Sequence, residues 1–318
     1  MPKNINTVWI TGARGFIGHH LASYFDRSGQ KVYGIGHGAL SDPQMRQFGL
    51  SGWINGEIEA TNLDSLKNMS GGPDVLYHLA GGSSVGPSIS NPLEDFSRTV
   101  TATARLFEWV RCHAPETTVI AISSAAVYGG GHSDAINETA VPHPYSPYGH
   151  HKLMMEQLCS SYRENFQMDV SIVRLFSVYG PRLAKQLLWD VCCKLYSRPN
   201  ELLLGGTGNE KRDWTDVRDV VRLLVHVAFL STDRPFILNG GTGVGTTVYE
   251  IAHTTLTEWS GIAAIRFSGK ARLGDPASLI ADNGLLSKSG FKWEIGVTQG
   301  IANYINWFRT HWSETLSV

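Results

Sequence analysis

Cysteine, long apolar runs and net charge are all scarce in this chain of 318 residues. Its 4 cysteines show no CxxC spacing and no disulfide framework, so we expect reduced and buried thiols at Cys112, Cys159, Cys192 and Cys193. No apolar run reaches the roughly 20 residues that a membrane-spanning helix needs. The net charge of -1 leaves no basic surface, so we expect no nucleic-acid partner and no polybasic contact with a membrane.

A secretion signal and a metal motif are also missing from the sequence. The opening residues, MPKNINTVWITG, have neither the charged region nor the apolar region of a signal peptide, which predicts a cytoplasmic protein. The 12 histidines include the pairs His19–His20 and His150–His151, but none stands in HExxH or another spacing typical of a metal site. We therefore expect no bound metal.

The first half of the chain alternates short β-branched runs with stretches of helix length. The runs are VWITG from Val8, VYGIG from Val32, VLYHLAG from Val75, TVIAISS from Thr118 and VSIVRLFSVYG from Val170. This alternation predicts right-handed βαβ units and a Rossmann-like, doubly wound parallel sheet, which is an α/β fold. We expect residues 1–178 to form this domain, with a segment at about 212–240 returning to it as a strand and a helix. The remainder of 179–318 should form a smaller C-terminal substrate lobe.

Gly12, Gly15 and Gly18 follow the strand that begins at Val8 and precede an amphipathic stretch. Glycines at this GxxGxxG spacing let the backbone turn tightly and approach a pyrophosphate, which then rests on the N-terminus of the next helix. A glycine triplet can also be a tight turn that binds nothing. The strand–turn–helix context favours a dinucleotide site in residues 1–178.

Tyr148 and Lys152 stand four residues apart at the start of the helical stretch SPYGHHKLMMEQLCSSY, hence on one face of a helix. An ammonium beside a phenol, together with a positive nicotinamide ring, lowers a phenol pKa that starts near 10 and allows acid/base chemistry near neutrality. A chance YxxxK is common in a chain with 11 tyrosines. The pattern gains weight from Ser124, which follows the predicted strand Thr118–Ile122 and would lie at its carboxyl end, where it can hydrogen-bond the reacting oxygen.

Five segments in this order carry a family resemblance: TGARGFIG, HLAG, SSAAVYG, SPYGHHKL and RLFSVYGPR. They resemble the extended short-chain dehydrogenase/reductase family, which contains NAD(P)-dependent nucleotide-sugar epimerases and dehydratases, and the similarity runs over nearly the whole chain. The stretch SPYGHHKLMMEQL is particularly similar to UDP-galactose 4-epimerases. The resemblance implies a nucleotide-diphosphate sugar as substrate, bound by the C-terminal lobe. It also implies a homodimer through the helices around Asp95–Val110 and Pro147–Glu164.

Residue roles follow from the same resemblance. The catalytic set is Ser124, Tyr148 and Lys152, in which Tyr148 is the acid/base and Lys152 also bonds the nicotinamide ribose. Besides Tyr148 and Lys152, the cofactor-binding residues are Gly12, Arg14, Gly15, Phe16, Ile17, Gly18, His37, Glu57, Ile58, Ala80 and Gly81. Glu57 and Ile58 bracket the adenine. The substrate-binding residues are Ser83, Ser84, Ser124, Ser177, Gln186, Arg212 and Arg272, of which the two arginines match positions that bind the diphosphate.

Three departures from the family pattern refine this assignment. Ser177 replaces an asparagine that is common in epimerases. Ala125 and Ala126 stand where dehydratases place an Asp-Glu pair, so we expect no 4,6-dehydration. Gly36 stands where an NAD-binding member offers an acid to the adenosine ribose, while Arg14 and His37 could face a 2′-phosphate, which tilts the expected cofactor from NAD towards NADP.

The sequence thus predicts a nucleotide-sugar epimerase that works at C4 through a 4-keto intermediate. One alternative is an NADPH-dependent reductase of 4-keto-sugar nucleotides, because the same residues can deliver a single hydride. A second is a non-catalytic regulator that only binds the cofactor. An intact Ser, Tyr and Lys set argues against the regulator, since a sensor needs no tuned phenol.

Overall fold

The computed structural model describes residues 5–197, 200–230, 234–270 and 276–315. The chain divides into two compact units, each described by itself. Unit 1 comprises Met1–Gly129, Ala140–Leu175 and Val221–Leu238; unit 2 comprises Gly130–Thr139, Phe176–Val220 and Asn239–Val318. Within the described ranges, no helix combines the length and apolar character that crossing a membrane requires.

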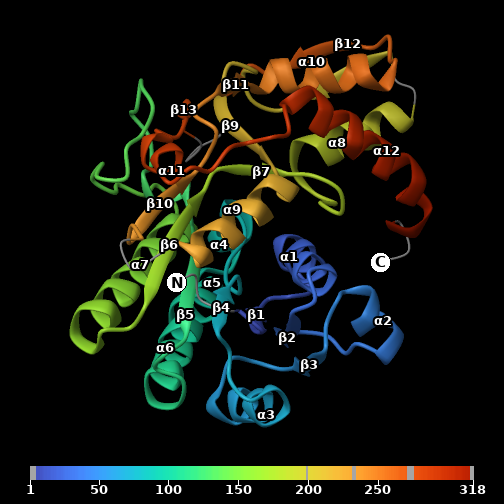
Figure 1. Ribbon diagram of the computed structural model, residues 1–318. Coiled ribbons are helices and arrows are strands. Elements are labelled where there is room, and N and C mark those ends of the chain that lie inside the picture. Colours follow the sequence, from blue (N-terminus) through green and yellow to red (C-terminus); the bar gives the residue numbers. More distant parts are fainter. Residues whose placement is uncertain (1–4, 198–199, 231–233, 271–275, 316–318) are drawn as a thin grey trace. The chain divides into compact units, whose positions relative to one another are not determined.

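Unit 1 is built on a seven-stranded sheet with the order β10-β6-β5-β4-β1-β2-β3 (Figure 1). The strands are β1 (Thr7–Thr11), β2 (Lys31–Gly36), β3 (Gly52–Asn55), β4 (Val75–His78), β5 (Thr118–Ser124), β6 (Val170–Leu175) and β10 (Ile237–Gly240). Neighbours from β6 to β3 pair in parallel, which confirms the predicted Rossmann-like fold. The strand order reverses between β1 and β4, and ligands bind outside the carboxyl ends of strands at such a point.

Helices cover both faces of this sheet. They are α1 (Phe16–Arg27), α2 (Asp42–Gln47), α3 (Ala60–Ser70), α4 (Val85–Ser90), α5 (Pro92–Phe96), the π-helix η1 (Ser97–Thr101), α6 (Ala102–His113), the 3-10 helix η2 (Ala125–Val127), α7 (Pro147–Phe166) and α9 (Val217–Phe229). Leu63 of α3, Phe107 of α6 and Met155 of α7 share one buried cluster with Leu76 of β4. Full burial of such a side chain stabilises the fold by about 1.5–3 kcal/mol.

Tyr77 follows Leu76 in β4 and points to the opposite face of the sheet, because successive strand residues point to opposite sides. Its ring lies 5.6 Å from that of Phe25 in α1, and its hydroxyl donates to the carbonyl oxygen of Leu224 in α9 at 3.4 Å. Tyr77 therefore packs against helices other than those that cover Leu76. The sheet is doubly wound, as predicted.

Unit 2 consists of small sheets and short helices. The elements are β7 (Ser177–Tyr179), α8 (Gln186–Tyr196), β8 (Glu201–Leu204), β9 (Lys211–Asp216), β11 (Gly245–Thr247), α10 (Val248–Trp259), β12 (Ala264–Phe267), β13 (Ser278–Leu279), α11 (Gly284–Lys288) and α12 (Val297–Thr315). Strands β7, β11 and β13 all pair with β9, and β12 pairs with β8. The strand and helix predicted over Arg212–Leu230 correspond to β9, which lies in unit 2, and to α9, which passes from unit 2 into unit 1 at Val221.

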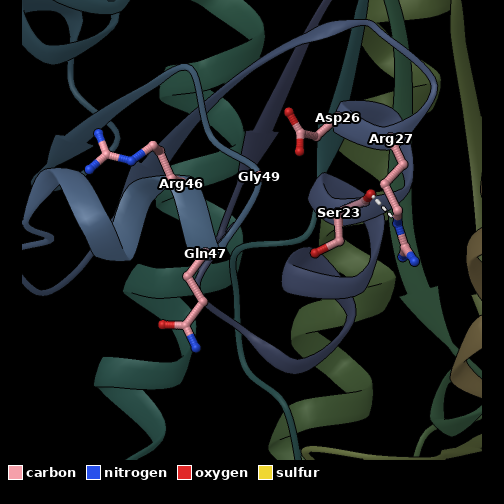
Figure 2. A pocket seen from close by; sticks show the side chains of 6 residues that line it. All are labelled: Ser23, Asp26, Arg27, Arg46, Gln47 and Gly49. Atoms are coloured by element: carbon pink, nitrogen blue, oxygen red, sulfur yellow. Dashed lines mark hydrogen bonds between the residues drawn. The ribbon is translucent and has the colours of Figure 1, made fainter.

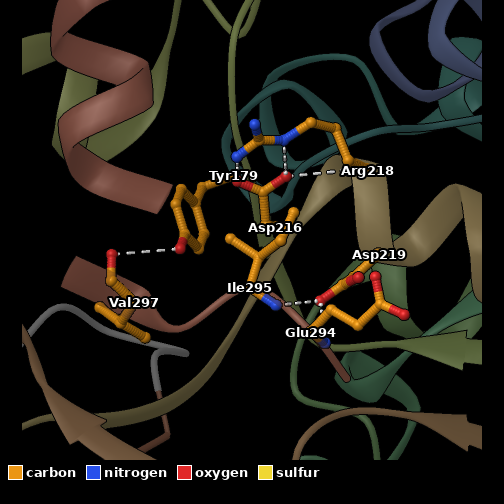
Figure 3. Close-up of polar contacts among 7 residues, drawn as sticks. All are labelled: Tyr179, Asp216, Arg218, Asp219, Glu294, Ile295 and Val297. Atoms are coloured by element: carbon orange, nitrogen blue, oxygen red, sulfur yellow. Dashed lines mark hydrogen bonds and ion pairs between the residues drawn. The ribbon is translucent and has the colours of Figure 1, made fainter. Parts of the chain in front are cut away.

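Buried carboxylates hold the loops of unit 2 (Figure 3). Asp219 accepts hydrogen bonds from the amides of Glu294 and Ile295 at 2.9 and 2.8 Å. Asp216 accepts a bidentate pair from the Arg218 guanidinium, at 2.8 Å from Nε and 2.7 Å from Nη2. Both carboxylates satisfy donors near the ends of β9 and α12, so they serve the architecture of this unit.

Two expectations from the sequence are wrong in detail. The run from Val170 is not one strand, because β6 ends at Leu175 in the large sheet and β7 begins at Ser177 in another sheet. The apolar composition of the run does not reveal the residue at which the chain leaves one sheet and enters another. The cysteines are not all buried either: Cys159 and Cys192 are, but Cys193 is half-buried and Cys112 is exposed. Cys112 lies in the last turn of amphipathic α6, beside Arg111 on the surface.

Candidate active site

The turn between β1 and α1 has the geometry of a pyrophosphate cradle. Gly12 takes a positive φ of 71°, and Gly15 is the N-cap of α1 without a side chain to fill it. A Cβ added to Gly18 would lie 2.4 Å from the carbonyl oxygen of Gly12, so only glycine permits this close turn. The cradle and the helix N-terminus fit the dinucleotide that the motif predicts. Arg14, Phe16 and Ile17 lie in the same turn and at the start of α1.

A chain of side-chain hydrogen bonds fixes the loop that follows β4, next to this cradle. Thr11 Oγ1 accepts from the amides of Leu79 and Ala80, both at 3.1 Å, and lies 2.8 Å from His78 Nδ1. His78 Nε2 lies 2.9 Å from Thr103 Oγ1, which donates to the carbonyl oxygen of Thr99 at 2.5 Å. Thr103 therefore accepts from His78 Nε2, which carries the ring proton, and Nδ1 accepts from the Thr11 hydroxyl.

His78 stays neutral in this chain. Burial, and secondarily the charge of Lys152, lower the pKa of its imidazole to about 3. The neutral ring donates from Nε2 to Thr103 and accepts at Nδ1 from Thr11, whereas protonation of Nδ1 would turn this acceptor into a donor and break the bond from the Thr11 hydroxyl. The result is a fixed path for Ala80 and Gly81, the two residues predicted to pass beneath the cofactor.

The N-terminus of α7 brings the phenol to the end of β5. Ser146 caps the helix by accepting from the amide of Gly149 at 3.2 Å, and Pro147 occupies the first helical position. A Cβ added to Gly149 would lie 2.6 Å from the carbonyl oxygen of Ala126, so the glycine lets α7 approach η2 closely. Ser124 at the end of β5 hydrogen-bonds the Tyr148 side chain.

The environment of Tyr148 acts on its acidity in both directions. Removal of solvent from the phenol raises its pKa above the ordinary value, the hydrogen bond from Ser124 lowers it, and the negative charge of Asp95 raises it again. The net direction in this structure is upward. The lowering by Lys152 and a positive nicotinamide ring that the sequence suggests stays a prediction.

Lys152 is a buried ammonium with only 4% of its surface exposed. Its Nζ donates to the carbonyl oxygen of Ile122 in β5 at 2.8 Å. Burial lowers the pKa of Lys152 to about 8, while the charges of Asp95 and Glu156 and the thiol of Cys159 act to raise it. Ser124, Tyr148 and Lys152 thus lie together in unit 1, where a phenol, a hydroxyl and an ammonium can move one proton.

The residues predicted near the adenosine gather at the ends of β2 and β3. Arg14 Nη1 donates to the carbonyl oxygen of His37 at 2.8 Å, and His37 Nε2 lies 3.5 Å from a carboxylate oxygen of exposed Glu57. Ile58 is buried in the core of unit 1. Gly36 is the last residue of β2. Arg14 and His37 lie together just beyond it, with the Glu57 carboxylate beside His37.

The residues predicted for the substrate fall in both units. In unit 1, Ser83 is exposed and Ser84 is the N-cap of α4. In unit 2, Ser177 begins β7, and exposed Gln186 begins α8 with a φ of 68°. Arg212 lies half-buried in β9 and donates from Nη1 to the carbonyl oxygen of Lys211 at 2.7 Å. Arg272 lies outside the described residues.

Sequence reasoning missed two residues beside the catalytic set. Asp95 of α5 and His151 of α7 are almost fully buried, with Nδ1 of the histidine 2.5 Å from Oδ2 of the aspartate. The only signal in the sequence was the uncommon double histidine before Lys152. Nothing local connects that histidine to an aspartate 56 residues earlier.

A shallow pocket elsewhere in unit 1 has no comparable chemistry (Figure 2). It is lined by Ser23, Asp26, Arg27, Arg46, Gln47 and Gly49. Arg27 is used locally, because its Nε donates to the carbonyl oxygen of Ser23 at 2.9 Å. None of the predicted site residues lines this pocket. Among the described residues, no group of three or more His, Cys, Asp or Glu side chains could hold a metal ion.

Comparison with known families agrees with this arrangement. Residues 8–235 match the NAD dependent epimerase/dehydratase family. The match spans most of the chain and includes the glycine cradle, Ser124, Tyr148 and Lys152. The chain belongs to this family, as the sequence motifs predicted.

Solved structures show how this fold is used by similar proteins. MoeE5, in complex with UDP-glucuronic acid and NAD, is 31% identical with a TM-score of 0.84, over 96% of this chain and 99% of that one. UDP-glucuronic acid 4-epimerase from Bacillus cereus, in complex with UDP-glucuronic acid and NAD, is 26% identical with a TM-score of 0.85 and the same coverage. TunA, an NAD-dependent NDP-hexosamine 5,6-dehydratase of tunicamycin biosynthesis, is 26% identical with a TM-score of 0.83, over 96% of this chain and 98% of that one.

Proposed function

We propose that this protein is a nucleotide-sugar 4-epimerase that uses NAD or NADP. The observation that carries the proposal is the cluster of Ser124, Tyr148 and Lys152 in unit 1, with the phenol hydrogen-bonded to Ser124. Membership of the NAD dependent epimerase/dehydratase family supports it. Two of the similar structures bind UDP-glucuronic acid, and one of these is a 4-epimerase by name, which favours a UDP-sugar as substrate.

Each residue of the cluster has one task in this proposal. Tyr148 takes the proton of the C4 hydroxyl and later returns it, Ser124 hydrogen-bonds the reacting oxygen, and Lys152 supplies a positive charge near the phenol. The glycine cradle would hold the dinucleotide, which would supply the chemistry to remove a hydride from C4 and to restore it. The configuration at C4 would be inverted if the 4-keto sugar turned between the two transfers.

The alternatives differ from epimerisation in their products. A 4-ketoreductase would consume NADPH with a 4-keto-sugar nucleotide, and none of the similar structures described above is named as a reductase. The absence of acids at Ala125 and Ala126 argues against 4,6-dehydration, although TunA shows that similar chains include a 5,6-dehydratase. A regulator would bind the dinucleotide and turn nothing over.

NMR of reaction mixtures separates these outcomes. The protein is incubated with UDP-glucose, UDP-galactose, UDP-glucuronic acid and UDP-N-acetylglucosamine, without added reductant, and the sugar signals are followed. We expect interconversion of C4 epimers with no net change in absorbance of the reduced nicotinamide. A 4-keto-6-deoxy or 5,6-unsaturated product would instead identify a dehydratase. No epimer from any sugar nucleotide, with stoichiometric NADPH consumption by a 4-keto-6-deoxy sugar nucleotide, would identify a reductase.

The proposed role of unit 2 is to bind the diphosphate of the sugar nucleotide. We propose that Arg212 and Arg272 bind it, since a guanidinium pairs well with phosphate oxygens, and that Ser177 and Gln186 contact the sugar nucleotide. Arg212→Ala should raise KM for the active sugar nucleotide at least tenfold and leave dinucleotide binding unchanged. An unchanged KM would remove Arg212 from the substrate site.

The choice between NAD and NADP rests on Arg14, His37 and Gly36. A 2′-phosphate near Arg14 would gain a charge-assisted hydrogen bond of about 1.5–3 kcal/mol, and Gly36 offers no carboxylate to repel it. The Glu57 carboxylate beside His37 opposes this preference, and the similar structures contain NAD. Calorimetric titration of both dinucleotides decides the matter. We expect Arg14→Ala to weaken NADP binding more than NAD binding, and tighter binding of NAD by the parent would refute the NADP preference.

We also propose a homodimer formed through α5, α6 and α7. Leu93 of α5 is 77% exposed, and Met154 and Phe166 of α7 are 40% and 49% exposed, which leaves apolar surface on these helices. Light scattering after size-exclusion chromatography should give twice the chain mass of 34.9 kDa, and Leu93→Asp should give the monomer. The cytoplasmic location stays a prediction of the sequence.

A further inference from the structure

Asp95 and His151 form a buried carboxylate–imidazole pair that the proposed reaction does not yet use. The side chains are 7% and 11% exposed, and Oδ2 lies 2.5 Å from Nδ1. Because an ionised carboxylate only accepts hydrogen bonds, His151 Nδ1 carries the proton of this bond. The Phe96 ring and the imidazole lie nearly perpendicular to each other, with centroids 5.5 Å apart. The pair therefore has a defined orientation between α5 and α7.

Two consecutive glycines connect this pair with the catalytic lysine. A Cβ added to Gly81 would lie 3.4 Å from Nζ of Lys152, and one added to Gly82 would lie 1.9 Å from Oδ1 of Asp95. The amide of Gly82 donates to Thr99 Oγ1 of the π-helix η1 at 2.8 Å. In the Gly81–Gly82 turn, Gly81 therefore packs against the Lys152 ammonium and Gly82 packs against the Asp95 carboxylate.

The surroundings of Lys152 leave Asp95 as its main source of negative charge. Besides Tyr148, one turn earlier in α7, the titratable groups that face Lys152 are Asp95 from α5, His78 from β4, and Glu156 and Cys159 from α7. His78 is neutral. Glu156 is engaged by the Arg174 guanidinium, with Nε at 2.9 Å and Nη2 at 2.6 Å from its two oxygens. Asp95 also faces Tyr148, where it raises the pKa of the phenol, while Ser124 lowers it.

We propose that Asp95 and His151 are positioning residues for the acid/base couple of Tyr148 and Lys152. The imidazole holds the carboxylate against the Gly81–Gly82 turn, and the carboxylate balances the buried ammonium and opposes the phenolate. The catalytic role of this pair rests on the proposed function. The effect of the Asp95 charge on Lys152 and Tyr148 does not depend on any substrate.

The sign of the effect follows from charge. Removing the Asp95 carboxylate withdraws support from the protonated Lys152, so the pKa of the lysine falls below about 8. It also removes repulsion from the phenolate, so the pKa of Tyr148 falls too. Both limbs of a pH–rate profile that needs phenolate and ammonium should therefore move to lower pH. A purely structural role would lower the rate and leave the limbs where they are.

Lysine NMR tests the inference without a substrate. The protein is labelled with ¹³Cε-lysine, the Lys152 signal is assigned with Lys152→Arg, and its pKa is measured in each variant. We expect Asp95→Asn to lower this pKa by about one unit. Glu94→Gln is the matched control, because it removes the same charge from the same helix at an exposed ion pair with Arg98. Equal pKa values for Lys152 in the folded parent, Asp95→Asn and Glu94→Gln would overturn the inference.

Variants of the histidine keep the test decisive if Asp95→Asn does not fold. His151→Leu removes the donor and should shift the Lys152 pKa, whereas His151→Gln retains an amide donor and should restore most of the parent value. A Lys152 pKa that is the same in both variants as in the parent would also overturn the inference. A shifted Lys152 pKa in a protein that converts no sugar nucleotide would refute the proposed function and leave this pair in place.

Discussion

Buried carboxylates in the two units differ in what they hold. In unit 2, Asp213 is fully buried and accepts from the amides of Thr242, Gly243 and Ala281 as well as from the Thr242 hydroxyl. Asp219 likewise accepts from backbone amides (Figure 3). In unit 1, Asp95 accepts from an imidazole and acts on two titratable side chains.

This difference separates a stabilising role from a chemical one. A carboxylate that accepts several backbone amides satisfies donors that would otherwise be buried without a partner, and its loss is felt in the free energy of unfolding. A carboxylate beside a lysine and a tyrosine changes where those groups titrate, and its loss is felt in a pH profile. Burial alone does not distinguish a stabilising carboxylate from one that acts on chemistry; the groups with which the carboxylate interacts do.

The largest effect should come from unit 1. Tyr148→Phe removes the only proton that the phenol can exchange, so we expect turnover of the active sugar nucleotide to fall by about 10²–10⁴-fold. The melting temperature and calorimetric dinucleotide affinity should stay near the parent values. Tyr145→Phe is the control, because Tyr145 is 49% exposed in the segment that leads to α7. Turnover of Tyr148→Phe close to that of Tyr145→Phe would end the acid/base assignment.

A smaller effect of a different kind should come from unit 2. Asp213→Asn turns amide hydrogens towards the backbone amides of Gly243 and Ala281, so we expect a loss of about 1–3 kcal/mol in the free energy of unfolding. Urea denaturation measures it. The pH dependence of turnover should be unchanged, in contrast to Asp95→Asn. A displaced pH profile in Asp213→Asn would break the distinction between the two kinds of carboxylate.

The smallest effect compares one helix cap from each unit. Ser146 caps α7 in unit 1. Thr247 caps α10 in unit 2 by accepting from the Glu250 amide, and its own amide donates to the Glu250 carboxylate. Alanine at either position should cost about 1 kcal/mol of stability, measured as a shift in melting temperature. Only Ser146→Ala should also lower kcat, because α7 begins with the segment that carries Tyr148. Equal kcat values in the two variants would show that the cap does not position the phenol.

The fold was predictable because most strands of the large sheet are long enough for their β-branched composition to be recognised in the sequence. The β-branched runs at Val8, Val32, Val75 and Thr118 all became strands of the large sheet. Strand β3 was not predicted, since GWIN has a glycine, an asparagine and only four residues. Such a strand forms through its register with β2, which is tertiary information.

Residue spacing predicted only those parts of the candidate site that are close in sequence, whereas Ser124 was predicted from its place after the strand at Thr118 and from the family resemblance. Tyr148 and Lys152 share a helix face, and the glycines share a turn, so spacing alone places them. His78 and Thr11, and likewise Asp95 and His151, meet only after the sheet has brought separate segments together. Their roles depend on burial and on distances that no local pattern encodes.

The position of β10 at the edge of the large sheet has a consequence for the newly made chain. Strand β6 ends at Leu175, yet its outer neighbour begins at Ile237, and the amide of Ile172 in β6 donates to the carbonyl oxygen of Phe236 just before that strand. At about 5–20 residues per second, a ribosome needs roughly 3–12 s to make the intervening segment. During that interval β6 presents an unpaired apolar edge that can capture another nascent chain. Expression at lower temperature or with chaperones should therefore improve the yield of folded protein.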